Sequence, residues 1–199
     1  MKNLLKLLIG LLLIAAVAAF VVKVSPVRRI NLPEGKLAWS NERPENARLC
    51  VPAAFTDAEG KIVGEYILNG QVFGAGNRPV LKVSICDDIF YIDSKWHSDF
   101  GFKQFSLVYN SKARRFSDTR RFVRRALCKK GDDVFLLQSW FPMTLTAFAE
   151  ECAKVSTNAA NLDMGSYGYG YTSVGKVKLP LLAWSVFGRK KQTNWLYVK

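Results

Sequence analysis

The stretch Asn158-Ala-Ala-Asn-Leu-Asp-Met-Gly-Ser-Tyr-Gly-Tyr-Gly-Tyr171 joins an amphipathic helix to strand-like sequence. Its acidic residue, Asp163, lies at the junction and is followed by small and glycine residues. Glycine lets a backbone and a ligand approach each other closely, so such a junction can present a carboxylate to a ligand. The alternative is a glycine-rich turn whose aspartate only hydrogen-bonds to the local backbone. The local sequence leaves both interpretations open.

The segments on either side of Asp163 have clear periodicity. Thr144 suits the N-cap of the preceding helix. Apolar residues then recur at helical spacing, namely Leu145, Phe148, Cys152 and Val155. Ala159 to Leu162 is predicted to be a short strand. Beyond Asp163, tyrosines at every second position from Tyr167 to Tyr171 would share one strand face, either for cross-strand packing or for stacking against a sugar.

Away from this junction the chain is a series of strand-like segments. Asn69-Gly70 predicts a tight hairpin turn between Glu65–Leu68 and Gln71–Phe73. Further strands are predicted at 80–85, 89–92, 105–109, 134–138 and 195–198. The sequence has neither regular βαβ alternation nor an internal repeat. We therefore expect an α+β fold, with mixed or antiparallel sheets and few helices, in a single domain after an N-terminal apolar segment.

The formal net charge of +13 on 199 residues is the unusual bulk property of the chain. It favours anionic partners, such as phosphate-bearing ligands, nucleic acid or an anionic membrane surface. The most basic stretch, residues 112–130, contains Asp118 as its only acid. Because it has few interleaved aromatic residues and the chain is predicted to be exported, no nucleic-acid partner is expected. The stretch is either a solvated loop or a source of arginines that grip a phosphate.

The N-terminus indicates export. A basic segment, Met1 to Lys6, precedes an uncharged apolar run from Leu7 to Val22. This run is long for the core of a signal peptide and short of the roughly 20 residues that span a membrane easily. We expect residues 1–24 to be a signal peptide or an uncleaved signal anchor. The rest of the chain would then be periplasmic or extracellular, and an uncleaved segment would anchor it to the membrane.

The domain is predicted to begin after a tether. Residues 25–46 contain Pro26, Pro33 and Pro44 among polar residues, which break regular structure. The domain would then cover residues 47–199. All 4 cysteines follow the apolar segment, and an even number in an exported chain permits two disulfides. No spacing of cysteine and histidine indicates a metal site, and no cofactor can be named.

Several motifs fall in the order found in one family of exported proteins. Met143-Thr-Leu-Thr-Ala-Phe-Ala-Glu-Glu-Cys152, continued by Ala160-Asn-Leu-Asp163, is similar to a helix followed by an Asn-Leu-Asp-Gly-Gly-Gly-Ser-Ser signature. Ala53-Ala-Phe55 with Asp57 is similar to an Asn-Gly-Gly-Phe-Phe-Asp motif. With these motifs the chain resembles the phosphodiester glycosidase family. That family includes the enzyme that removes N-acetylglucosamine from a phosphodiester on mannose.

Three other segments extend the resemblance over residues 47–199. They are similar to a Phe-Gln…Pro-Leu-Leu segment, an Arg-Arg strand and a terminal strand of the family. In this sequence they are Phe102-Lys-Gln104 with Leu107-Val-Tyr-Asn110, Arg124-Arg-Ala126, and Asn194-Trp-Leu-Tyr-Val198. The resemblance implies hydrolysis of a sugar-1-phosphodiester in envelope or extracellular glycans.

The resemblance also implies which residues would form the site. Asp163 would be the principal catalytic carboxylate, and Asp57 is a second candidate. The substrate-binding candidates are Gln104, Arg124, Arg125, Asn161, Gly165 and Ser166. Cleavage at an anomeric carbon needs stabilisation of an oxocarbenium-like state and commonly uses two carboxyl groups. The leaving phosphate needs charge neutralisation more than a proton, and arginine can supply it.

Two positions of the signature differ from the family. Met164 and Ser166 stand where the family has glycine. Both changes add side chains where the family has bare backbone. We therefore keep a second function open, that of a catalytically inactive protein that binds glycans or phosphoglycans on the same scaffold. The expected partner in both cases is a phosphorylated glycan or sugar phosphodiester.

Overall fold

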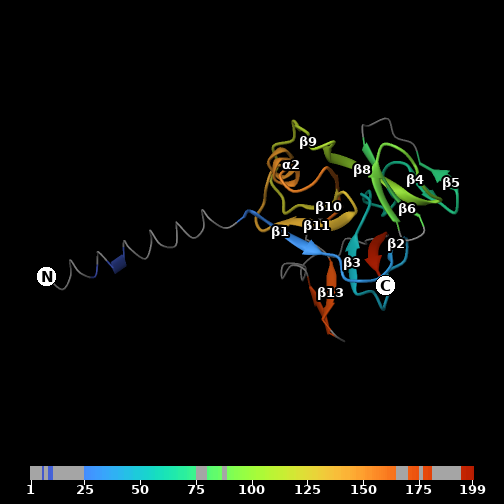
Figure 1. The fold of residues 1–199 in the computed structure, drawn as a ribbon, viewed down its shortest axis with the longest axis horizontal. Coiled ribbons are helices and arrows are strands. Elements are labelled where there is room, and N and C mark those ends of the chain that lie inside the picture. The colour runs from blue at the N-terminus through green and yellow to red at the C-terminus, as the bar shows by residue number, and fades with distance from the viewer. Residues whose placement is uncertain are drawn as a thin grey trace.

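From residue 25 on, the described residues form two antiparallel sheets and one helix, packed as layers (Figure 1). The computed structural model describes residues 6, 9–10, 25–74, 80–86, 89–164, 170–174, 177–180 and 194–199. Every strand pair in these ranges is antiparallel. The prediction of a sheet-rich α+β domain with few helices is confirmed. Within the same ranges no helix is both long and apolar enough to cross a membrane.

The larger sheet has 10 strands, and its main path joins segments from both halves of the sequence. In spatial order this path is β1 (Val27–Asn31), β11 (Asp133–Ser139), β10 (Arg125–Lys130), β12 (Asn158–Asn161), β8 (Phe100–Tyr109), β4 (Tyr66–Leu68) and β5 (Gln71–Phe73). Three more strands extend it from β8, namely β6 (Val80–Cys86), β7 (Ile89–Asp93) and β9 (Lys112–Ala113). The predicted strands in these regions are confirmed with small shifts of their ends, except that β8 begins five residues before the predicted segment 105–109.

The smaller sheet has 5 strands and draws on both ends of the domain. Its spatial order is β14 (Val177–Pro180), β13 (Tyr171–Val174), β3 (Leu49–Pro52), β15 (Trp195–Val198) and β2 (Leu37–Ser40). The strand β15, last in sequence, therefore lies between two early strands.

Alternating side chains give the larger sheet two apolar faces, as the period of two in a strand requires. Leu127, Leu136 and Ala160 belong to the core shared with the smaller sheet. Their neighbours Cys128 and Phe135 belong to a second core on the opposite face, beneath the helix. The order of layers is therefore smaller sheet, larger sheet, helix.

The helix α2 (Leu145–Ala153) forms where the sequence predicts it, but it ends before Val155, which is exposed and does not belong to the apolar face. The Thr144 hydroxyl accepts a hydrogen bond from the Ala147 N–H at 3.2 Å, which caps the first turn. Such a cap contributes about 1 kcal/mol to helix stability. The buried face of α2 is formed by Leu145, Phe148, Ala149 and Cys152, and it packs on the second core.

Two of the cysteines meet beneath this helix. Cys128 on β10 and Cys152 on α2 are both fully buried. Burial, followed by the hydrogen bond and charge of the neighbouring Cys128 thiol, raises the pKa of Cys152 well above its ordinary value. Both residues carry thiols in this structure, so the disulfides expected from the cysteine count do not include a bond between these two.

Residues 25–46 belong to the domain and do not form the expected tether. They contain β1, which pairs with β11, and β2, which pairs with β15. The physical reason is the placement of the prolines, because Pro26 and Pro33 flank β1 and Pro44 follows β2. Each strand itself is free of proline, so its N–H groups remain available for pairing. The structure thus extends the folded domain back to Val27.

The Asn69-Gly70 hairpin is confirmed in its predicted form. It joins β4 to β5, and both turn residues have positive φ, 50° at Asn69 and 75° at Gly70. These angles are those of a type I′ turn, which matches the twist of the flanking strands. The hairpin lies at the end of the molecule opposite α2 (Figure 1).

Candidate functional site

A cleft of about 400 Å³ lies beside the end of β12, and both charged and aromatic side chains line it. Its charged lining residues are Asp118, Arg120, Arg124 and Asp163. Its other lining residues are Phe55, Phe105, Phe122, Val123, Leu145, Asn161, Leu162 and Met164. We call Asn161, Asp163 and the backbone that holds them the cleft floor. The exposed side, formed by residues 118–124, is the cleft rim.

The floor carboxylate is fixed by backbone bonds on both sides. The Leu162 N–H donates to the Arg125 carbonyl and the Asp163 N–H to the Ala53 carbonyl, each at 2.9 Å. The Thr56 hydroxyl lies 3.5 Å from Oδ2 of Asp163. Asp163 is only 4% exposed. The fold thus holds this carboxylate at the base of the cleft, where a low local dielectric strengthens its interaction with positive charge.

The segment that holds Asp163 is itself held by Asn194. Ala54 donates its N–H to Oδ1 of Asn194 at 2.7 Å and accepts from Nδ2 of Asn194 at 3.1 Å. The indole N–H of Trp39 donates to the same Oδ1 at 3.3 Å. Asn194 is fully buried. Its amide therefore connects the strands of the smaller sheet to the cleft floor.

Asn161 lines the cleft and has a buried acceptor that is not hydrogen-bonded within the described residues. Its Nδ2 donates to the Leu162 carbonyl at 3.2 Å. Its Oδ1 is buried and has no hydrogen-bond partner among the residues that the structure describes. An unpaired buried acceptor is costly and uncommon in proteins. A ligand hydroxyl or amide in the cleft would reach this oxygen only after the Asn161 side chain turns toward the cleft.

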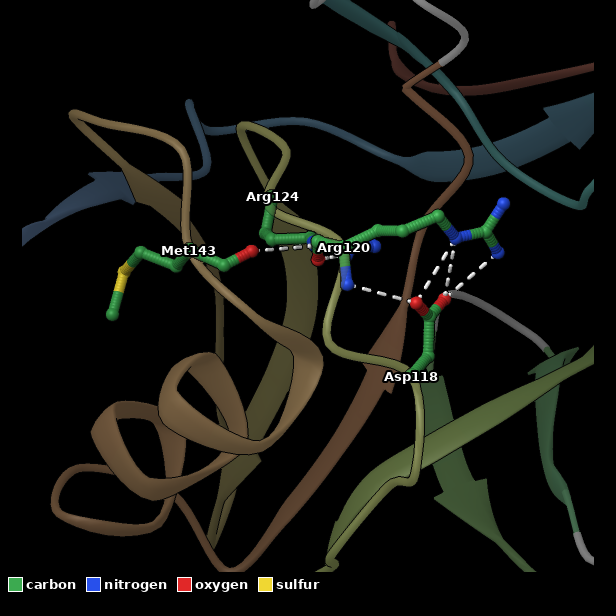
Figure 2. Close-up of polar contacts among 4 residues, drawn as sticks. All are labelled: Asp118, Arg120, Arg124 and Met143. Atoms are coloured by element: carbon green, nitrogen blue, oxygen red, sulfur yellow. Dashed lines mark hydrogen bonds and ion pairs between the residues drawn. The ribbon is translucent and has the colours of Figure 1, made fainter.

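Arg124 supplies positive charge on the rim (Figure 2). Its Nε donates to the Met143 carbonyl at 3.2 Å and its Nη2 to the Arg120 carbonyl at 3.0 Å. Burial lowers the pKa of Arg124, while the charge of Asp118 opposes this shift. Across the described ranges no carboxylate lies within ion-pairing distance of this guanidinium. Its charge is therefore oriented by carbonyls and available to an anion.

Asp118 and Arg120 form the second charged group of the rim (Figure 2). Arg120 donates Nη2 to Oδ2 at 2.8 Å, and Nε and the backbone N–H to Oδ1 at 3.0 and 2.9 Å. These side-chain and backbone hydrogen bonds lower the pKa of Asp118 to about 2. Asp118 is therefore ionised at neutral pH and carries no proton for general-acid catalysis.

Arg125, the neighbour of Arg124, does not line the cleft. Successive residues of an extended chain point to opposite sides. Arg125 is fully buried and donates Nε and Nη2 to Oε1 of Gln138 at 3.0 and 2.7 Å. Burial, followed by the charge of Arg28, lowers the pKa of Arg125 to about 9. Its backbone carbonyl, rather than its charge, supports the cleft floor.

Two other predicted site residues also lie outside the cleft lining. Gln104 is buried behind the floor, where its Oε1 accepts from the Phe105 N–H at 3.1 Å and its Nε2 lies 3.5 Å from the Ala53 carbonyl. Asp57 closes a turn, because its Oδ1 accepts from the Lys61 N–H at 2.8 Å. Gly165 and Ser166 lie outside the described residues.

The candidate site residues chosen from the sequence did not include the aromatic walls of the cleft, formed by Phe55, Phe105 and Phe122. They also did not include Asp118, the acid of the rim. Phe55 and Phe105 meet edge to face, with ring centroids 5.4 Å apart. Arg124 lies over the ring of Phe122, 5.1 Å from its centroid. Phe55 belongs to the motif Ala53-Ala-Phe55 and Phe105 directly follows Phe102-Lys-Gln104, so the sequence did contain a signal for both rings. Asp118 had a signal too, as the only acid in the basic stretch.

A larger hollow, of about 720 Å³, lies around His97. The imidazole Nε2 is 2.6 Å from Oδ2 of Asp93, and the ring stacks on Tyr91 with centroids 4.2 Å apart. The imidazole therefore already has a polar partner at Nε2 and a stacking partner on its face. A grouping of three or more potential metal ligands is absent from the described ranges.

Comparison with known proteins gave no assignment, since the chain matches no protein-family model and no curated protein. The functional inference therefore depends on the residues of the cleft and on the motif resemblance described above.

Proposed function

We propose that the protein is an exported, glycosidase-like hydrolase of sugar-1-phosphodiesters in envelope or extracellular glycans. The observation that carries the proposal is the meeting of Asp163, Asn161 and Arg124 in one cleft. The first is a carboxylate and the second a buried acceptor without a hydrogen bond in the described residues. The third is a cation without a carboxylate partner in the same residues. This combination fits a ligand that carries a sugar and a phosphate.

The proposed reaction breaks the bond between the anomeric carbon and the phosphate oxygen. The bonding electrons leave with the phosphate, whose charge Arg124 stabilises. Asp163 stabilises the positive charge that develops on the sugar. Water then adds its oxygen to the anomeric carbon and gives up a proton to solvent. The products are a free sugar and a phosphomonoester, so no general acid is required of Asp118.

The aromatic walls support the sugar half of this proposal. Apolar ring faces, such as those of Phe55 and Phe105, are good partners for the C–H face of a sugar. The carbonyl of Asn161 would accept from a sugar hydroxyl. The proposed division of the cleft is therefore sugar near the floor and phosphate near Arg124 on the rim.

The test is turnover of a panel of sugar-1-phosphodiesters by the purified chain and by Asp163→Asn. This variant keeps the shape of the side chain and removes its charge. Loss of the stabilising charge is expected to lower kcat on the order of 10³-fold. The matched control is Asp57→Asn, which removes an acid that does not line the cleft and is expected to leave kcat unchanged.

Two results would overturn the hydrolase proposal. Turnover that survives unchanged in Asp163→Asn removes Asp163 from the chemistry. Absence of turnover with every diester, in a preparation that binds sugar phosphates, favours the second candidate function.

That second candidate is a glycan- or phosphoglycan-binding protein without catalysis. The specific observation in its favour is Met164, which is buried and lines the cleft at a position where the resembling family has glycine. Its side chain adds volume to the cleft where the resembling family has bare backbone. Titration calorimetry with a sugar-1-phosphate would then show binding by both wild type and Asp163→Asn, without hydrolysis. Turnover that appears in Met164→Gly would show that this side chain blocks an otherwise competent site.

A further inference from the structure

Three aromatic side chains stand exposed on two neighbouring loops. Phe141 is 64% exposed, Phe122 49% and Trp140 44%. The loops are joined by paired backbone bonds, since the Phe122 N–H donates to the Met143 carbonyl and the Met143 N–H to the Phe122 carbonyl, at 3.1 and 2.8 Å. The three rings therefore project from one braced unit.

Arginines surround these rings. Arg28 lies over the ring of Trp140, 4.9 Å from its centroid. Arg121 is exposed, and its Nε donates to the Pro142 carbonyl at 3.2 Å. We name Arg28, Arg121, Phe122, Trp140 and Phe141 the aromatic–arginine face. Arg28 is half-buried, whereas Arg121 is exposed. Exposed rings beside arginines are typical of surfaces that sit at a membrane–water interface.

The charge of this face is of one sign. Residues 25–29, 120–124 and 139–143 contain no Asp or Glu. The closest acid in sequence, Asp118, is neutralised by Arg120. Arg29 is paired with Asp133 at 2.7 Å and does not add to the face. The face therefore complements an anionic surface.

The aromatic–arginine face lies close to the segment that follows the N-terminal apolar run. The Trp140 N–H donates to the Pro26 carbonyl at 3.0 Å. Pro26 is four residues after Val22, the end of that run. Four residues span at most about 14 Å. The interfacial layer of a bilayer is about 5–8 Å thick on each side. A chain held in a membrane by residues 7–22 thus has Trp140 within reach of the lipid headgroups.

We propose that the aromatic–arginine face docks on the surface of an anionic lipid bilayer. The rings enter the interfacial layer, while the exposed Arg121 binds a lipid phosphate. Because β1 enters the domain at the α2 end, docking leaves the β4–β5 hairpin pointing away from the membrane (Figure 1). Phe122 belongs both to the face and to the cleft lining, so the cleft rim would lie next to the lipid surface.

The test uses the full chain reconstituted into phosphatidylcholine vesicles, with and without phosphatidylglycerol. Lipids brominated on their acyl chains quench only tryptophans that reach the bilayer. The chain has 5 tryptophans, so the contribution of Trp140 is the difference between wild type and Trp140→Phe. We expect this contribution to be quenched in vesicles that contain phosphatidylglycerol and to remain unquenched in those without it.

Two variants on the face measure separately the contribution of an exposed ring and that of a positive charge. Phe141→Ser is expected to lower the docking equilibrium constant about ten-fold, because an exposed ring no longer enters the interface. Arg121→Gln is expected to lower it about five-fold. The matched controls are Val72→Ser, an exposed apolar residue on the distant β5, and Lys95→Gln in the turn before β8, which should change nothing.

Three outcomes would overturn the proposal. One is the absence of quenching at Trp140 in vesicles that carry the chain. Another is equal quenching with and without phosphatidylglycerol, which would remove the role of lipid charge. The third is equal effects of the face variants and their controls.

Discussion

The floor and the rim of the cleft are built in different ways. The floor carboxylate depends on backbone and amide bonds from Ala53, Arg125 and Asn194, which are far apart in sequence. The rim depends on contacts within one basic segment and the loop before α2, such as Arg120 with Asp118 and Arg124 with Met143. The floor is buried, whereas the Arg120 side chain on the rim is 74% exposed.

Because of this difference, the floor and the rim should respond differently to substitution. A buried group joined to several strands cannot change without cost to the fold. An exposed charge held by local bonds can change while the fold persists. We therefore expect floor substitutions to act first on stability or chemistry, and rim substitutions to act on binding.

The largest expected effect on stability is that of Asn194→Ala. The substitution leaves the N–H and carbonyl of Ala54 and the indole N–H of Trp39 without their amide partner. We expect a loss of about 2–4 kcal/mol in the free energy of unfolding, since each unpaired buried polar group costs about 1–3 kcal/mol and relaxation recovers part of it. Urea unfolding followed by circular dichroism measures this loss.

The control for that substitution is Asn41→Ala, an exposed asparagine between β2 and β3. Its expected effect is within about 0.5 kcal/mol. If both substitutions cost the same, the floor is not the structural junction described above.

A smaller effect is expected for Arg124→Gln on the rim. Removal of a charge-assisted hydrogen bond costs about 1.5–3 kcal/mol, so affinity for a sugar-1-phosphate should fall about 10–100-fold. Stability should change little, because the guanidinium bonds only to carbonyls near the surface. Calorimetric titration and thermal unfolding separate the two quantities.

Arg115→Gln is the matched control, since Arg115 is an exposed arginine of the same basic segment and does not line the cleft. Equal loss of affinity in both variants would mean that net charge, and not the position of Arg124, determines binding.

The smallest expected effect concerns the protonation of Asp118. Hydrogen bonds from Arg120 lower the pKa of Asp118 to about 2. Because the pKa is lowered in the folded state, the pair stabilises the rim above the ordinary carboxyl pKa of about 4 and loses that contribution as pH falls through about 2. Carboxyl carbon NMR should show the low midpoint, and Arg120→Ala should return it toward about 4. An unchanged midpoint in Arg120→Ala would assign the shift to another group.

The elements of this fold were largely predictable because their signals are local. Thr144 and the apolar spacing after it gave α2, and Asn69-Gly70 gave the hairpin. The partners of each strand were not predictable, because pairing depends on residues distant in sequence. The prolines of residues 25–46 were interpreted as breaks in the chain, but in the structure they mark the ends of β1 and β2.

The cleft could be predicted only in part for the same reason. Asp163, Asn161 and Arg124 were selected from motifs, and the structure brings them together. Arg125 was selected with Arg124, but neighbours in an extended segment face opposite sides, and the burial of each side is set by the sheets around it. Asp118 was missed because its role depends on Arg120 and on the loop that carries both.

The position of β15 has a consequence for the order of folding. This strand is last in sequence among those described, yet it pairs with β3 on one side and β2 on the other. Contacts between such distant segments form slowly, because a long loop must close before any bond is gained. Asn194, which precedes β15, completes the support of Ala54 only after that closure. During refolding, recovery of the cleft should therefore lag behind formation of α2 and the β4–β5 hairpin. The rate at which ligand binding recovers would then report the rate at which β15 pairs.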